Sequence, residues 1–266
     1  MKYYVVADIH SYYTELIKAL TEKGFFEDNE PHKLIICGDL LDRGTEPCET
    51  IDFVLDLAKK DQVILIRGNH EDLMETMLDD IVYGDIYEYE MGKSIHVKNR
   101  TFDTALRLTG LEPMYALAHA KELVAKVKQT EYYKKLLPMC VDYFETDRFI
   151  FTHGYIPCNA TEGCNIYRPY KRYCFNKDWR NASNEDWRYA RWYNGMEFAS
   201  KRNLNVLDKT VVCGHWNCSY GHAEIDHKCS EFGKDADFSP YYGEGIIGID
   251  ACTAFSGKVN CIVIED

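Results

Sequence analysis

Five short polar clusters carry the residue types that bind metals or transfer protons. Each contains Asp, Asn or His and directly follows an apolar run, and they occupy residues 7–10, 38–44, 68–71, 153–154 and 214–215. One such cluster is weak evidence of a site, because Asp and Gly commonly follow strands as turn residues. Five in succession are better explained by one shared site.

The combined donor set of carboxylate, amide and imidazole suits divalent metals of intermediate hardness, and a central carboxylate can bridge two of them. Two ions about 3.5 to 4 Å apart clamp a phosphoryl group and acidify a bridging water. An alkoxide leaving group also needs a nearby acid, and a carboxylate bonded to an imidazole favours the protonated form that donates. The residues therefore indicate phosphoester hydrolysis.

The apolar runs before these clusters are short and rich in Val, Ile, Phe and Tyr, as buried strands are. They lie at 3–7, 34–37, 63–66, 148–151 and 210–213, with two more at 245–249 and 259–264. Helical spacing over 12–23 and 48–60 separates the first three runs. This βαβαβ order predicts parallel strands with right-handed crossovers, so all five clusters are expected at the same edge of the sheet.

After Glu71 the pattern becomes mostly helical, which predicts a helical insertion at about 72–145 within a single domain spanning 1–266. His96 and His119 in this insertion are expected to be surface or packing histidines.

The segment at about 155–182 is rich in Tyr, Arg and Lys and is expected to be an irregular loop. A helix is expected to start near Ser183, because Ser183 and Asp186 have the spacing of a capping box.

The formal net charge of -12 argues against a broad nucleic-acid surface, which requires many Lys and Arg side chains. A small phosphorylated ligand stays compatible, since a metal pair reverses the local sign. The chain has no signal-peptide pattern and no apolar run near the 18 or so residues of a membrane span, so a cytoplasmic protein without membrane contact is expected. Eleven scattered cysteines without a CxxC pair favour reduced thiols.

The motifs D-x-H, G-D-x-x-D-R-G, G-N-H-E, H-G and G-H, in this order over residues 8–215, resemble the calcineurin-like metallophosphoesterase superfamily. The resemblance is to its phosphoprotein phosphatase branch and the related bacterial dinucleoside tetraphosphatases. It implies an α/β fold, a four-layer α/β/β/α sandwich with a βαβαβ N-terminal half and a helical insertion. Two departures are Ser11, where glycine is commoner, and Asn217, where broader members of the superfamily have a second histidine.

The resemblance also implies two divalent ions, Mn²⁺ first, with Fe or Zn as alternatives. It implies six metal ligands: Asp8 and His10 for one ion, Asp39 as the bridge, and Asn69, His153 and His215 for the other ion. His70 would donate a proton to the leaving oxygen, Asp42 would orient His70, and Arg43 would bind the phosphoryl oxygens. Glu71 is expected to support the ligands from behind, to stabilise a helix N-terminus, or to act directly.

A second phosphate-binding arginine is expected before the last histidine motif. Arg191 is the first choice and Arg188 the next, with Arg168 and Arg172 behind them. Spacing alone does not separate these four, since one helical turn decides which side chain faces the metals.

The leading functional hypothesis is a metallophosphatase that hydrolyses phosphomonoesters, either phosphoproteins or small molecules. Dinucleoside polyphosphate hydrolysis is the alternative, because the aromatic and basic side chains of 167–192 could stack on a nucleobase as well as dock a phosphopeptide. A catalytically inactive binding or scaffold protein is a third hypothesis. The intact motif set counts against it, since loss of activity usually breaks the ligands first. The expected partner is in each case a phosphorylated molecule.

Overall fold

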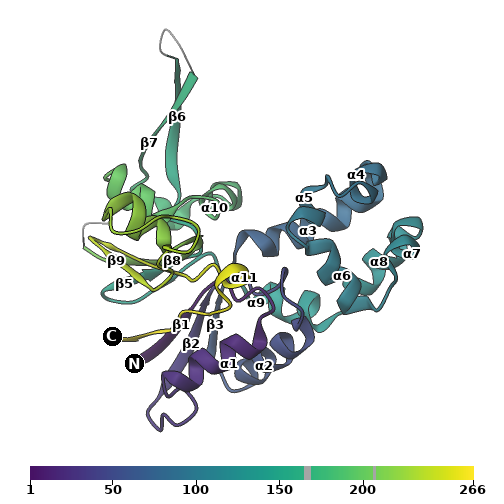
Figure 1. The fold of residues 1–266 in the computed structure, drawn as a ribbon, viewed down its shortest axis with the longest axis horizontal. Helices are drawn as coiled ribbons and strands as arrows, with labels where there is room; N and C mark the ends of the chain where they lie inside the picture. The colour runs from purple at the N-terminus through teal and green to yellow at the C-terminus, as the bar shows by residue number, and fades with distance from the viewer. Residues whose placement is uncertain (165–168, 206–207) are drawn as a thin grey trace.

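The computed structural model describes residues 1–164, 169–205 and 208–266, and these form two sheets packed face to face (Figure 1). The first sheet has the spatial order β11 (Ile262–Glu265), β1 (Lys2–Val6), β2 (His32–Cys37) and β3 (Val63–Ile66). The second has the order β4 (Phe144–Glu145), β5 (Phe149–Phe151), β8 (Thr210–Asn217), β10 (Ile246–Asp250) and β9 (Tyr241–Gly243).

The central strands of both sheets are parallel. β1, β2 and β3 pair in parallel, as do β5, β8 and β10, whereas β11, β4 and β9 pair antiparallel with their neighbours. The predicted parallel βαβαβ half is therefore confirmed. The expectation of a single sheet edge is wrong, since two of the five predicted strands belong to the second sheet.

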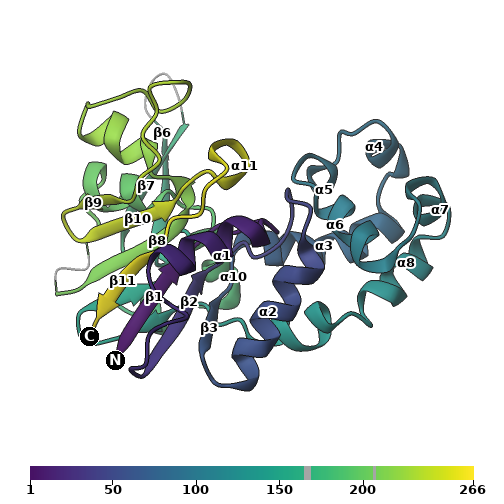
Figure 2. The ribbon, with the colours of Figure 1, turned by 60° about the horizontal axis from the view of Figure 1, so that its bottom comes forward.

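Alternation along the strands builds the layers, because successive side chains point to opposite faces. Tyr3 and Val5 face the second sheet, where they meet Phe151 in a buried apolar layer. Tyr4 and Val6 face the other way and pack with α1 (Tyr13–Glu22) and α2 (Pro47–Lys59), which cover the first sheet (Figure 2).

The outer face of the second sheet is covered in the same way. Ile150 and Val211 pack there with Trp187 of α10 (Asn184–Ala190) and Phe198 of the π-helical turn η3 (Glu197–Lys201). The result is the expected α/β/β/α order of layers.

A run of helices follows β3 and gathers at one end of the molecule (Figure 1). They are α3 (Asn69–Tyr83), α4 (Ile86–Glu90), α5 (Ile95–Lys98), α6 (Thr101–Thr109), α7 (Pro113–Ala118), α8 (Ala120–Val127), η1 (Tyr132–Leu136) and α9 (Leu137–Met139). Their apolar faces join the core of α1 and α2. His119, with φ -126° and ψ 46°, separates α7 from α8.

A two-stranded hairpin stands where the sequence indicates an irregular segment. β6 (Cys158–Cys164) pairs antiparallel with β7 (Pro169–Phe175), and the pair projects from the body of the molecule (Figure 1). Its strands contain Gly, Cys and charged residues without apolar alternation, so the backbone pairing leaves little trace in the sequence. Residues 165–168, including Arg168, lie outside the described part of the chain.

The predicted helix start at Ser183 is confirmed. Ser183 Oγ accepts a hydrogen bond from the Asp186 amide at 3.2 Å, and the Ser183 amide donates to Asp186 Oδ2 at 3.1 Å. In the described part of the chain, no helix has the length and apolar character needed to span a bilayer. The ten cysteines whose side chains are described are all free.

Candidate metal centre

The polar clusters come together where the carboxyl ends of the two sheets meet, and their backbone is held in an unusual conformation. Six of these residues and the adjacent Ser11 have left-handed φ angles between 50° and 78°; the six are Asp8, His10, Asp39, Asp42, Arg43 and His215. Each such angle costs a residue with a Cβ about 1–2 kcal/mol. Strain of this kind concentrates at functional sites, where the surrounding structure maintains it.

Two motif glycines leave room for the carboxylates. A Cβ on Gly68 would lie 2.2 Å from Asp39 Oδ1, and a Cβ on Gly214 would lie 2.1 Å from Asp8 Oδ2. Any larger residue at either position would displace the carboxylate, so these glycines are part of the geometry of the site.

One group of donor atoms converges on Asn69 and Asp39. Asn69 Oδ1 lies 2.8 Å from His153 Nε2 and 2.9 Å from His215 Nδ1. Asp39 Oδ1 lies 3.3 Å from His153 Nε2. The Nδ1–H of His153 donates to the Cys37 carbonyl at 2.8 Å, which leaves Nε2 to face the group.

A second group shares Asp39. Each of His10, Asp39 and His70 offers one potential donor atom, and these three atoms lie within 4.8 Å of one another. The Nδ1–H of His10 donates to the Leu41 carbonyl at 3.0 Å, and its Nε2 lies 3.7 Å from Asp39 Oδ2. The predicted ligand Asp8 is buried beside this group, where its Oδ2 accepts the His215 amide at 2.9 Å.

The surroundings of Asp39 keep its carboxylate ionised. Burial alone would raise the pKa of Asp39, but His153, His70, His10 and His215 outweigh burial and hold that pKa well below its ordinary value. Asp39 therefore stays ionised in a buried position.

Other carboxylates at this site are pushed toward protonation. Burial, then the charges of Asp250 and Asp39, raise the pKa of Asp8 well above its ordinary value. Burial, followed by Asp39, raises the pKa of Glu71 to about 7. A divalent cation would offset this repulsion, and the donor set of carboxylate, amide oxygen and imidazole fits two divalent ions that share Asp39.

His70 and Asp42 form a buried pair, with Nδ1 of the imidazole 2.7 Å from Asp42 Oδ2. Burial lowers the pKa of His70, but the Asp39 charge and the hydrogen bond to Asp42 outweigh it, and the pKa lies above the ordinary 6.5. Arg43 covers the same region, since its Nη1 is 2.9 Å from His10 Nε2 and its Nη2 is 3.2 Å from His70 Nε2.

Three supporting residues complete the site. Glu71 accepts the backbone amides of Gly68, Asp39 and Leu40 at 2.7 to 3.0 Å, which joins the turns after β2 and β3. Thr101, at the start of α6, donates its hydroxyl to Asp42 Oδ2 at 2.7 Å.

Asp250 is the third of these residues, buried at the end of β10, and burial raises its pKa to about 6. Sequence reasoning gave neither Thr101 nor Asp250 a role. The strand-end rule that found the other carboxylates could have found Asp250, whereas Thr101 carries no comparable signal.

The candidate arginines lie in different surroundings. Arg191 is 5% exposed, and its Nη2 donates to Asp142 Oδ1 at 2.8 Å while its Nη1 lies 3.3 Å from Asp72 Oδ2. The charge of Arg191 also acts on His153: burial is the main cause that lowers the pKa of this histidine, and Arg191 lowers that pKa further. Arg188 is exposed on α10, and Arg172 is exposed on the hairpin strand β7.

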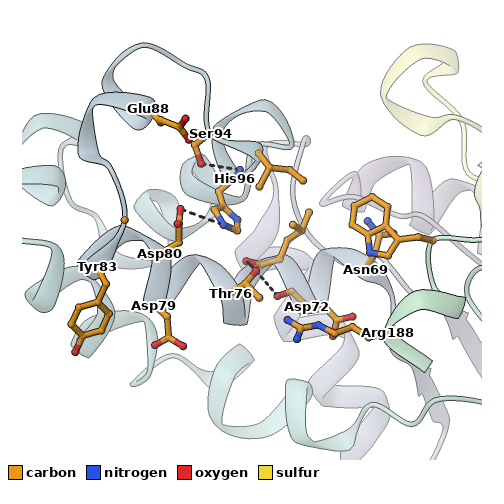
Figure 3. A pocket seen from close by; sticks show the side chains of 14 residues that line it. Asn69, Asp72, Thr76, Asp79, Asp80, Tyr83, Glu88, Ser94, His96 and Arg188 are labelled. Carbon is orange, nitrogen blue, oxygen red and sulfur yellow. Dashed lines mark hydrogen bonds and ion pairs between the residues drawn. The ribbon is translucent and has the colours of Figure 1, made fainter. Parts of the chain in front are cut away.

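A groove of about 720 Å³ opens beside the metal centre and runs along α3 (Figure 3). Asn69 lies at the end nearest the site, and His96 lies farther along. Arg188 and Trp192 contribute to its wall.

Comparisons with known proteins agree with this geometry. Residues 1–238 match the model of a family described as calcineurin-like phosphoesterase. The chain is 24% identical over 162 residues to the asymmetrical bis(5'-nucleosyl)-tetraphosphatase PrpE of Halalkalibacterium halodurans, covering 58% of this chain and 57% of that protein. It is 25% identical over 243 residues to the symmetrical bis(5'-nucleosyl)-tetraphosphatase of Nitrosospira multiformis, covering 82% of each.

Among solved structures, a cold-active protein tyrosine phosphatase has a similar fold, with a TM-score of 0.54 and 15% identity, covering 99% of this chain and 73% of that one. The fold, the donor atoms and the family match agree with the phosphoesterase class that the motifs predict.

Proposed function

This chain belongs to the calcineurin-like phosphoesterase family, and we propose that it hydrolyses dinucleoside tetraphosphates with the help of two divalent metal ions. The leading hypothesis from sequence was phosphomonoester hydrolysis. The named relatives favour the alternative, because the two reported above are both tetraphosphatases, and one of them aligns over 82% of this chain.

The observation that carries the proposal is the convergence of donor atoms on Asp39 from both sheets. His10 and His70 form one donor group with this carboxylate, and His153 and His215 form a second donor group with it. We assign Asp8 and His10 to one ion, Asn69, His153 and His215 to the other, and Asp39 to both. Mn²⁺ is the proposed metal. When bound, two such ions would polarise a phosphoryl group and make water a better nucleophile.

The remaining roles follow from hydrogen bonding. Asp42 fixes the His70 ring through Nδ1, so Nε2 is the atom that can give a proton to the leaving phosphate oxygen. Arg43 lies beside both His10 and His70, where its guanidinium can bind two phosphoryl oxygens and oppose charge that develops on them. Arg191 is the proposed second phosphate ligand, although binding would require it to exchange one of its carboxylate partners.

A substrate panel tests this function. The protein is freed of metal with a chelator, reloaded with Mn²⁺, and incubated with diadenosine tetraphosphate, an aryl phosphate and a phosphopeptide, with nucleotide products separated by anion exchange. We expect the dinucleotide to be cleaved to mononucleotides with the highest kcat/KM of the three.

Variants test the residue roles. His70→Asn and Asp39→Asn should reduce dinucleotide cleavage at least 100-fold, the order expected for loss of an acid or a metal bridge. His119→Asn, at an exposed histidine of the insertion, is the matched control and should retain activity. A metal-loaded protein that cleaves none of the substrates, or prefers the phosphopeptide, would contradict the proposal.

A further inference from the structure

An exposed tryptophan stands beside the metal centre and has no part in the proposed chemistry. Trp192 directly follows Arg191 at the end of α10 and is 44% exposed. Its indole meets the His215 imidazole edge to face, with ring centroids 5.7 Å apart. A single exposed aromatic residue needs no explanation on its own, but this one touches a proposed metal ligand.

Trp192 also lines the groove that begins at Asn69. The groove volume of about 720 Å³ lies within the range of about 300–1,000 Å³ that small-ligand sites occupy. Figure 3 shows Asp72, Asp79 and Asp80 along α3, with Arg188 near Asp72. A ligand in the groove would therefore have Trp192 at its inner end and α3 along its side.

The groove wall selects against phosphate and for hydrogen-bond donors. Asp72 is already paired with Arg67 and Arg191, but the carboxylates of Asp79, Asp80 and Glu88 still outnumber the guanidinium of Arg188, so a polyphosphate chain would be repelled. Carboxylates accept hydrogen bonds from hydroxyl and amino groups.

The buried His96 lies on the same wall, with its Nε2 3.7 Å from Asp80 Oδ2. Among the described residues, no atom hydrogen-bonds its Nδ1. A polar group in the ligand could therefore meet this nitrogen.

A nucleoside has the complementary features: an aromatic base, ribose hydroxyls and no charge. Base stacking on an aromatic side chain tolerates any base, because every base has a π-face. The phosphates of the same substrate would stay at the metal end, where Arg43 and the proposed ions would supply positive charge.

We propose that Trp192 is the stacking platform for one nucleobase of the substrate and that the groove along α3 holds that nucleoside. This inference rests on the proposed function and deepens it, since it explains how a dinucleotide is preferred over a simple phosphomonoester.

Kinetics with two substrates test the proposal. Trp192→Ala should raise KM for diadenosine tetraphosphate about tenfold, within the worth of one base–aromatic stack, whereas KM for an alkyl phosphate, which has no ring to stack, should rise much less. Trp192→Phe should restore most of the loss. Trp216→Ala is the matched control, since Trp216 is 37% exposed and 6.1 Å from the His215 ring but does not line the described groove.

Adenosine, which carries no phosphate, separates this inference from the proposed function. It should quench tryptophan fluorescence of the wild type and of Trp216→Phe, but not of Trp192→Phe. If the wild type cleaves the dinucleotide and Trp192→Ala leaves KM unchanged, the platform is overturned. If the wild type cleaves no dinucleotide, the proposed function fails. Separately, adenosine quenching that persists in Trp192→Phe would overturn the role of Trp192 as the stacking platform.

Discussion

Individual residues at the metal centre give up stability to hold their positions. Ser11 is fully buried with φ 58°, and among the described residues its hydroxyl has no hydrogen-bond partner. A left-handed backbone and an unsatisfied buried hydroxyl are both unfavourable. His70 depends in a similar way on a neighbour, because Asp42 helps to keep its imidazole protonated.

Ser11→Gly should stabilise the protein. Glycine removes both the backbone strain and the unsatisfied hydroxyl. This stabilisation exceeds the cost of the greater chain entropy of glycine in the unfolded state, so the free energy of unfolding should rise by about 1 kcal/mol. For a chain of this length the melting temperature should rise about 2–4 °C, measured in chelator so that metal does not contribute. Ser11→Ala removes the hydroxyl and keeps the Cβ, so it should stabilise less. A lower melting temperature for both variants would refute the argument.

Asp42→Asn should change the pH dependence of catalysis. Because the pKa of His70 is raised, its imidazole is protonated below that pKa and loses the proton as pH rises through it. Removing the Asp42 charge lowers the pKa of His70, so the imidazole loses its proton at a lower pH. At neutral pH the rate with a phosphoserine peptide should fall about 100-fold, and the rates with the dinucleotide and with an aryl phosphate should fall less, because phosphate and aryl oxide leaving groups need an acid less than an alkoxide does.

The control for this substitution is Thr101→Val, which removes one hydrogen bond to Asp42 but keeps the charge. Its pH–rate profile should keep the midpoint of the wild type, because the charge of Asp42 remains, although turnover falls with the loss of this hydrogen bond. Superimposable profiles for Asp42→Asn and the wild type would show that His70 is not the acid.

At the scale of elements, apolar runs predict strands well and their partners poorly. β3 matches its predicted range of 63–66 because it consists of four consecutive apolar residues, three of them buried. The apolar runs did not indicate which strand belongs to which sheet, because an apolar run shows that a strand is buried but not which element packs against it. The hairpin of β6 and β7 was missed because backbone pairing holds polar strands together.

The sequence likewise predicted some residues of the candidate metal centre and not others. Four of the six proposed ligands, His10, Asp39, His153 and His215, lie in the two groups of potential metal donors, and strand ends bring them together. Thr101 was not predictable, since one threonine at a helix start has no distinctive spacing. Its role arises from how α6 packs against the turn after β2.

An ion-pair cluster joins three elements at the edge of the second sheet. Glu145 of β4 pairs with Arg180 of η2 (Trp179–Asn181) and, at 2.7 Å, with Lys209 next to β8. Hydrogen bonding from Arg180, more than the Lys209 contact, lowers the pKa of Glu145 to about 2. A lowered carboxylate pKa adds stability above the ordinary value of 4.5, and this stability is lost as pH falls toward 2.

Glu145→Gln should therefore reduce the free energy of unfolding at pH 7, by about 0.5–1 kcal/mol because the cluster is largely solvent-screened. The deficit should shrink between pH 4.5 and pH 3 in urea titrations. Asp147→Asn changes the net charge equally at an exposed neighbouring residue and should show no such pH dependence. A deficit that stays constant with pH would rule out the ionised pair as its cause.

At the scale of the whole molecule, the metal centre joins the two sheets. Asp8, Asp39 and Asn69 follow strands of the first sheet, and His153 and His215 belong to the second. Burial, and after it the repulsion between carboxylates at this junction, raises the pKa values of Asp8 and Asp250. Bound cations should therefore stabilise the contact between the sheets as well as the site.

Metal should accordingly raise the melting temperature. A ligand at 1,000 times its Kd adds about 4 kcal/mol of stability, which corresponds to roughly 10 °C for a chain of this size. Thermal melts in chelator and in excess Mn²⁺ should differ by about this amount, and Asp39→Asn should lose most of the difference. His222→Asn, at a histidine bonded to the Ser239 carbonyl, should keep it. Equal melting temperatures with and without metal would exclude the assigned centre.

The hydrogen bond from Thr101 to Asp42 has a consequence for protein engineering. Arg100, the preceding residue, also donates to the Arg43 carbonyl at 3.3 Å, so the helical insertion holds both Asp42 and Arg43, the residues of the turn with proposed roles in catalysis. A chimera that received this insertion from a relative would inherit a different support for the proposed proton donor. Exchanging the insertion would therefore alter turnover along with the groove, and a transplant intended to change specificity alone must keep the start of α6.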